Sequence, residues 1–159
     1  MSNNHTSGAA SFGAALRRLI DQLDGALEAA YRADGLDFRP RYTPILRAIL
    51  AHGPLTLRGL ADQLGVSHSA ISQTIAQMTA RQLVTVAKGR DARERIVDLS
   101  DATLALLPRL ERHWATAREA TEALDTAVGG MLVDTVERAN AALAERPFQQ
   151  WLEDGRRYN

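Results

Sequence analysis

The sequence predicts a mainly α-helical fold with one small β-hairpin, and three observations support this fold class. Apolar residues recur every three or four positions along most of the chain, which is the spacing of a buried helix face. Capping residues, glycines and prolines separate these segments from one another. Only residues 84–100 differ, because strand-like runs at 84–86 and 96–99 flank a charged turn. The length of 159 residues suits one domain or one compact subunit.

Each expected helix has a recognisable beginning or end. The helices are expected over residues 12–31, 43–52, 56–64, 67–82, 101–128 and 131–145. The expected N-caps are Thr43, Thr56, Ser67 and Ser100. Pro108 falls inside the fifth helix, where one lost backbone hydrogen bond predicts a kink and a candidate hinge. Residues 1–10 are small and polar, which predicts a disordered tail.

The third and fourth helices, joined at Gly65-Val66, form a helix-turn-helix pattern. Glycine allows the sharp turn, and Val66 is expected to fill the angle between the helices. Ile71, Ile75 and Met78 share one face of the fourth helix and are expected to be buried. The opposite face and its flanks then carry short or hydrogen-bonding side chains, namely His68, Ser69, Ser72, Gln73, Ala76, Gln77 and Ala80.

This face suits the major groove of DNA. Residues 66–80 contain no carboxylate that would repel phosphates. Gln73 and Gln77 can pair with adenine edges. Ser67, with the free backbone amides at the helix start, can hold a phosphate. The fourth helix is therefore predicted to be a recognition helix.

Charge is distributed unevenly along the chain. The formal net charge is zero, with 19 basic and 19 acidic residues. Residues 39–95 nevertheless hold nine basic and three acidic residues, and the remainder carries the compensating negative charge. A basic middle between acidic ends indicates one surface that faces a polyanion.

The hairpin turn at residues 88–95 reads KGRDARER, in which four of eight residues are basic. Beside a recognition helix, such a ribbon is a wing whose tip can reach the flanking backbone or the minor groove. Arg93 is assigned to the groove, and Asp91 is expected to brace the turn by accepting hydrogen bonds. The expected phosphate contacts are Lys88, Arg90 and Arg95.

Residues 60–100 resemble the core of the MarR (multiple-antibiotic-resistance regulator) family. Asp91-Ala92-Arg93 matches that family's Asp-x-Arg wing motif, and Leu99-Ser100 follows at the usual distance. The resemblance is good over residues 41–110. It implies winged-helix homodimers that bind short palindromic operators and are often released by small anionic or phenolic ligands.

On matching positions, the resemblance gives Asp91 and Arg93 the wing roles. The residues that fall where the family's recognition helix meets DNA are Ser67, His68, Ser69, Ser72 and Gln73. The chain departs from the family in two places. His68 and Gln73 stand where many members have Lys or Arg, and the segment after Ser100 reads DATLALL without the usual glycine.

The predicted architecture is a winged helix-turn-helix with N- and C-terminal dimerisation helices. Its parts are a disordered tail (1–10), an N-terminal dimerisation helix (11–35), the winged helix-turn-helix DNA-binding domain (41–100) and C-terminal dimerisation helices (101–155). The end segments carry more apolar residues than a lone winged helix needs, which predicts packing across a two-fold axis. Such a dimer would present two recognition helices ~34 Å apart, one DNA turn.

An effector pocket for a small aromatic or anionic ligand is a further prediction. Its candidate residues are Tyr31, Tyr42, Arg47, His113 and Trp114. The rings could stack on a ligand, and Arg47 could pair with a carboxylate. The alternative is ordinary core and interface packing, which the sequence favours.

Several functional classes find no support in the sequence. Catalytic motifs and cysteine are missing, and the four histidines are scattered, so no enzyme, cofactor or metal site is predicted. No apolar run approaches the ~18 residues of a membrane span, and no secretory signal is recognisable, so a cytoplasmic protein is expected. The predicted function is a homodimeric DNA-binding regulator, expected to be a repressor. The alternative is a winged-helix adaptor that docks another protein and touches DNA weakly.

Overall fold

The computed structural model describes residues 5–89, 91 and 94–157. The chain forms two compact units, of which the first ends at His113 and the second begins at Trp114. The winged helix-turn-helix lies within the first unit. None of the helices in the described ranges is long and apolar enough to cross a membrane.

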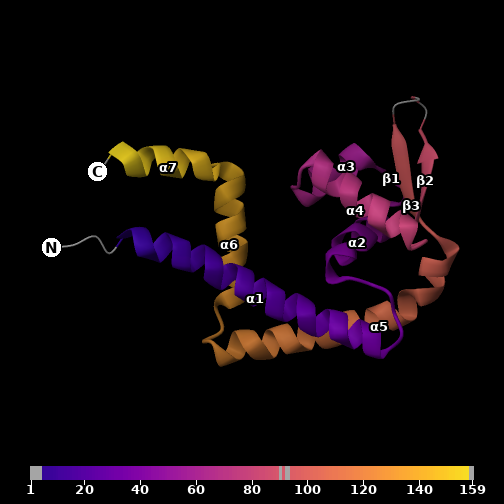
Figure 1. Cartoon of the computed structure of the whole chain (residues 1–159), viewed down its shortest axis with the longest axis horizontal. Coiled ribbons are helices and arrows are strands. Elements are labelled where there is room, and N and C mark those ends of the chain that lie inside the picture. The colour runs from indigo at the N-terminus through magenta and orange to yellow at the C-terminus, as the bar shows by residue number, and fades with distance from the viewer. Residues whose placement is uncertain (1–4, 90, 92–93, 158–159) are drawn as a thin grey trace. The chain divides into compact units, whose positions relative to one another are not determined.

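Helices dominate the described part of the chain, which confirms the predicted fold class. The helices are α1 (His5–Ala33), the 3-10 turn η1 (Pro40–Tyr42), α2 (Thr43–His52), α3 (Leu57–Leu64), α4 (His68–Ala80), α5 (Asp101–Ala127), α6 (Leu132–Glu145) and α7 (Phe148–Arg157). The strands are β1 (Leu55–Thr56), β2 (Val84–Lys88) and β3 (Arg95–Leu99). They form one antiparallel sheet in the order β1-β3-β2, with β2 and β3 as the hairpin wing (Figure 1).

Strand β1 was not expected from the sequence. Leu55 pairs with Val97 and Thr56 with Ile96, so this short strand widens the hairpin into a three-stranded sheet. Two residues are too few to show alternation, and their partners lie about 40 positions away in the sequence. The same Thr56 caps α3, which ties the start of α3 directly to the sheet.

Three of the four predicted N-caps are confirmed. The Thr56 hydroxyl accepts a hydrogen bond from the Gly59 amide at 2.9 Å, and the Ser67 hydroxyl accepts one from the Ala70 amide at 3.2 Å. The Ser100 hydroxyl accepts from the Thr103 amide at 3.1 Å. The prediction for Thr43 is wrong. Because η1 runs directly into α2, Thr43 is already helical (φ −55°, ψ −47°).

Two other expectations need correction. Helix α1 begins at His5, so the segment predicted to be a disordered tail is helical from that residue on. Alanine is a strong helix former, and Ala9 and Ala10 stand just before the expected start of this helix. Val66 is 44% exposed and does not fill the angle between α3 and α4. Gly65 in the left-handed conformation (φ +64°) turns the chain, and the Val66 amide bonds back to the Ala61 carbonyl.

Buried residues of α4 hold the helix-turn-helix in place. Ile71, Ile75 and Met78 are 0–4% exposed, as predicted from their spacing. Leu60 of α3 and Val97 of β3 are fully buried. This burial fixes the rotation of α4 about its own axis, and thereby the face that it shows to solvent.

Helix α5 runs through Pro108 and is fixed to the end of α4 and the wing at its start. Thr103 is fully buried, and its hydroxyl donates to the Leu83 carbonyl at 2.7 Å. The Ser100 hydroxyl donates to the Gln82 carbonyl at 2.6 Å. The hinge role of Pro108 stays a prediction.

Replacing Thr103 with valine is expected to lower the free energy of unfolding by about 1 to 2 kcal/mol, because valine keeps the shape but cannot donate to Leu83. Urea unfolding followed by circular dichroism measures the change. Thr121→Val is the matched control, since exposed Thr121 donates to the Ala117 carbonyl within the same helix. The control should change stability by no more than about 0.5 kcal/mol. Equal losses in the two variants would contradict the contribution assigned to the buried bond.

Candidate nucleic-acid interface

The face of α4 predicted to meet DNA is exposed. All of its members are solvent-accessible, namely Ser67, His68, Ser69, Ser72, Gln73, Ala76, Gln77 and Ala80. The N-cap at Ser67 leaves the first amides of α4 at the surface, where a phosphate can bind. The helix therefore presents to solvent a polar, carboxylate-free side that lies away from the buried residues that anchor it.

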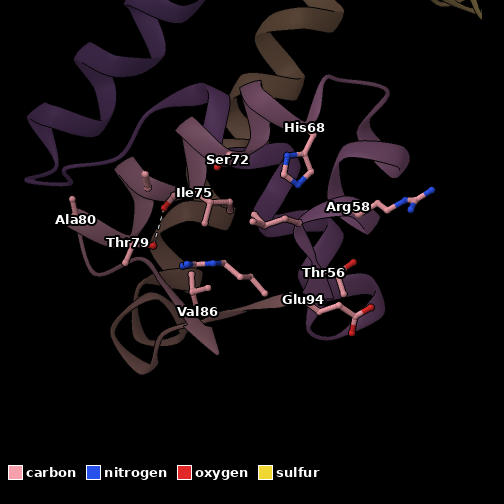
Figure 2. Close-up of a pocket in the computed structure, with 12 residues that line it drawn as sticks. Thr56, Arg58, His68, Ser72, Ile75, Thr79, Ala80, Val86 and Glu94 are labelled. Carbon is pink, nitrogen blue, oxygen red and sulfur yellow. Dashed lines mark hydrogen bonds between the residues drawn. The ribbon is translucent and has the colours of Figure 1, made fainter. Parts of the chain in front are cut away.

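A hollow of about 1010 Å³ lies between α4 and the wing (Figure 2). We call it the wing-side hollow. Its lining residues are Thr56, Leu57, Arg58, His68, Ser72, Ile75, Ala76, Thr79, Ala80, Val86, Glu94 and Arg95. They come from the start of α3, one flank of α4 and both strands of the wing. Figure 2 shows the His68 ring pointing into the hollow and the Arg58 guanidinium directed outward.

The position of the wing-side hollow determines what it can hold. A recognition helix lies in the major groove, and a wing reaches the adjacent minor groove. The sugar-phosphate strand that separates the two grooves must then pass between them. Arg58 and Arg95 supply positive charge there, and Thr56, His68 and Ser72 supply hydrogen-bonding groups. The hollow thus has the chemistry of a phosphate channel.

Sequence reasoning missed Arg58. The apolar spacing of α3 predicts only which of its residues are buried, so it assigns no role to an arginine on the exposed side. Its side chain is 88% exposed, and among the described residues its ion pair is with Asp62 at 3.8 Å, which is itself 74% exposed. Such a solvated pair is weak and leaves Arg58 available to a phosphate. Its place in the first turn of α3, two residues after the Thr56 cap, was the available signal.

Gln77 lies on the other flank of α4. Its side-chain carbonyl accepts a hydrogen bond of 2.5 Å from Arg41 of η1. The backbone carbonyl of the same residue accepts one from Arg81, which also forms an ion pair of 3.2 Å with Asp37. The adenine contact predicted for Gln77 requires its carbonyl as well as its amino group. That contact would therefore compete with Arg41.

The wing residues are described in part. Lys88 pairs with Arg95 across the strands, and both side chains are exposed. The Asp91 carbonyl accepts a hydrogen bond from the Glu94 amide at 2.9 Å, which closes the turn. Arg90 and Arg93 lie outside the described residues, so the phosphate and groove roles given to them stay predictions. Glu94 is the one carboxylate among the lining residues described for the wing-side hollow.

The candidate effector residues lie apart from the wing-side hollow. Tyr31 and Tyr42 are 1% and 0% exposed, and each makes an edge-to-face contact with Phe38. Tyr31 also contacts the His113 ring at 5.1 Å between centroids. This is the packing expected of an ordinary core. Arg47 is exposed on α2, and Trp114 belongs to the second unit. The pocket itself stays a prediction.

His113 takes part in an ionic cluster at the end of α1. Its Nε2 atom lies 3.2 Å from the Asp34 carboxylate, and the Arg109 Nε donates to the same oxygen at 3.3 Å. The hydrogen bond from Arg109, followed by that from His113, holds the pKa of Asp34 below its usual value. The cluster joins α1 to α5. Among the described residues, no group of three or more acidic or histidine side chains is placed to hold a metal ion.

A helix-turn-helix followed by a hairpin wing, with an exposed polar helix beside a basic channel, defines a winged-helix DNA-binding protein. The family model described as MarR family matches residues 35–94, which hold α2, β1, α3, α4 and the first strand of the wing, β2. Over this segment the chain is similar to the MarR family. No curated protein matches it by sequence.

Solved structures of the same fold extend the similarity beyond the matched segment. The M. tuberculosis transcriptional regulator MOSR in complex with DNA is 26% identical, with a TM-score of 0.65 over 83% of this chain and 96% of that one. A mutant MarR from E. coli complexed with operator DNA is 16% identical, with a TM-score of 0.67 over 89% and 99%. PcaV from Streptomyces coelicolor in complex with its natural ligand is 18% identical, with a TM-score of 0.63 over 88% and 99%.

Arg58→Ala and Arg95→Ala are each expected to weaken binding to an operator duplex and to a random duplex by a similar factor. Each loses a phosphate contact, so the slope of log K against log salt falls by about 0.9 for every copy of the chain on the DNA. Fluorescence anisotropy at several salt concentrations measures both effects. Arg112→Ala removes the same charge from an exposed site on α5 and should bind as the parent does. An unchanged slope in the Arg58 and Arg95 variants would exclude the channel.

Proposed function

We propose that this protein is a homodimeric transcriptional repressor that binds a palindromic operator. Helix α4 lies in the major groove, and the wing lies in or beside the adjacent minor groove, where Arg93 is the contact predicted from the sequence. The observation that carries the proposal is the exposed, carboxylate-free face of α4 beside the wing-side hollow with its Arg58 and Arg95. MOSR and the E. coli MarR mutant, solved with DNA, support the same use of this fold.

Exposed apolar residues support the dimer. On α1, Phe12, Leu16, Ile20 and Leu23 are 40–65% exposed and lie on one face at spacings of three and four. Helices α6 and α7 add exposed side chains, namely Val133, Val136, Leu143, Phe148, Trp151 and Leu152. Solvent-exposed stripes of this kind are costly in a lone chain and favour burial against a second copy.

Release by a small ligand is the proposed means of control. A dimer that binds a fixed palindrome depends on the spacing of its two recognition helices, so a ligand that alters this spacing weakens binding. PcaV, which shares the fold, was solved with its natural ligand, and this supports the proposal. The site proposed from the sequence is the region of Tyr31, Tyr42, Arg47, His113 and Trp114.

Selection of bound duplexes from a random pool tests the main proposal. A two-fold symmetric motif with half-sites about one DNA turn apart is the expected result. An asymmetric motif, or no enrichment, would contradict it. The salt dependence of binding separates DNA binding from the adaptor alternative. The affinity of a protein that contacts phosphates falls steeply as the salt concentration rises, whereas the affinity of an apolar docking surface does not.

Gln73→Ala is expected to reduce discrimination between the selected operator and a random duplex by about 1 to 3 kcal/mol, because it removes a base contact. Binding to the random duplex should change little. Gln63→Ala removes an exposed glutamine from α3 and serves as the control. Anisotropy titrations on both duplexes give the ratio. Equal losses on the two duplexes would argue against base reading by Gln73.

Ile20→Glu is expected to raise the dissociation constant of the dimer tenfold or more, which corresponds to about 1.4 kcal/mol, because it places a charge in the apolar stripe of α1. Sedimentation velocity at micromolar concentration measures the shift toward monomer. Leu50→Glu makes the same change at an exposed residue of α2 and should leave the dimer intact. A parent that is monomeric, or an Ile20 variant that stays dimeric, would refute the stripe as the interface.

A further inference from the structure

The two flanks of α4 differ in a way that the DNA major groove explains. Successive residues of a helix are about 100° apart around its axis. Measured from buried Ile75, His68 and Ser72 fall at about 20° and 60°, on the side of the wing-side hollow. Gln73 falls at about 160°, on the outward face. Gln77 falls at about 200°, on the flank that faces away from the hollow.

A helix seated in the major groove has a phosphate strand on each side of it. The wing-side hollow, with Arg58 and Arg95, provides positive charge for one strand. The opposite flank needs a cation of its own if both strands are held. Arg41 is the side chain that the structure places there, because its guanidinium group donates to the Gln77 carbonyl at 2.5 Å.

The Arg41 side chain is exposed to solvent, and two contacts fix its position. Its guanidinium group lies 5.6 Å from the centre of the Tyr42 ring, and Tyr42 is fully buried, so the ring is a fixed platform. The Gln77 hydrogen bond holds the other side of the group. Both contacts leave guanidinium donors unused, since an arginine has five of them. A charge held in this way loses little entropy when it binds a phosphate.

We propose that Arg41 binds the backbone phosphates of the second strand, and that Gln77 positions Arg41 rather than reading a base. The proposal rests on the DNA binding proposed above and adds to it a contact on the η1 side of α4. It gives α4 one cationic contact region on each flank, contributed by segments far apart in the sequence. It also replaces the adenine contact predicted for Gln77.

A double-mutant cycle on the full chain tests both roles. The variants are Arg41→Ala, Arg41→Lys, Gln77→Ala and the combined Arg41→Ala/Gln77→Ala, measured on the selected operator and on a random duplex. Arg39→Ala is the matched control, because it removes the same charge two residues away, where Arg39 lies 3.9 Å from Glu28. Thermal melts confirm that each variant is folded.

Arg41→Ala is expected to weaken binding to both duplexes several-fold and to lower the salt slope by about two for a dimer, since each copy loses one phosphate. Arg41→Lys should recover most of the slope, because it restores the charge. Gln77→Ala should cause a smaller and equal loss on both duplexes, and no further loss when Arg41 is already alanine.

Three results would overturn the inference. One is an Arg41→Ala salt slope equal to that of the Arg39→Ala control. The second is a Gln77→Ala variant that selects a different motif from the random pool, which would make Gln77 a base reader. The third is a full Gln77→Ala loss in the Arg41→Ala background. A parent chain that binds neither duplex would instead refute the proposed function, so the two failures are distinguishable.

Discussion

The interface depends on one constraint, which is the burial of Ile71, Ile75 and Met78 against the rest of the winged-helix unit. Three apolar side chains on one stripe allow only one rotation of α4 about its axis. A rotation of α4 about its axis by one residue position, about 100°, would expose this stripe. It would also bury polar side chains such as Gln73 without hydrogen-bond partners. The hydrophobic effect thus sets which side chains of α4 face solvent, and these are the side chains proposed to meet DNA.

The segment from residue 34 to 42 connects this helix to the long helices. At one end, Asp34 binds Arg109 and His113 of α5. Further along, Asp37 forms an ion pair with Arg81, which caps the end of α4. Arg41 donates a hydrogen bond to Gln77 in the last turn of the same helix. A displacement of α5 against α1 would act on this segment first. The segment thus links the end of α1 and the first half of α5 to α4 through polar contacts.

The sequence predicted local features well because they depend on neighbouring residues. Caps such as Thr56 and Ser67, and the buried stripe of α4, follow from spacing alone. Features that depend on distant partners were missed. Strand β1 exists only through pairing with Val97, and the Thr43 cap failed because η1 precedes it without a break. The contact between Arg41 and Gln77 spans 36 positions, which no local pattern reveals.

A formal net charge of zero is compatible with DNA binding because the cations are divided between two tasks. Some stabilise the protein, as Arg81 does with Asp37 and Arg109 with Asp34. Others meet no strong carboxylate partner in the described chain, as Arg95 on the wing shows. Exposed ion pairs contribute little, whereas each phosphate neutralised releases counterions and adds to affinity. For the proposed DNA binding, the placement of a few arginines around α4 therefore counts for more than the total charge of the chain.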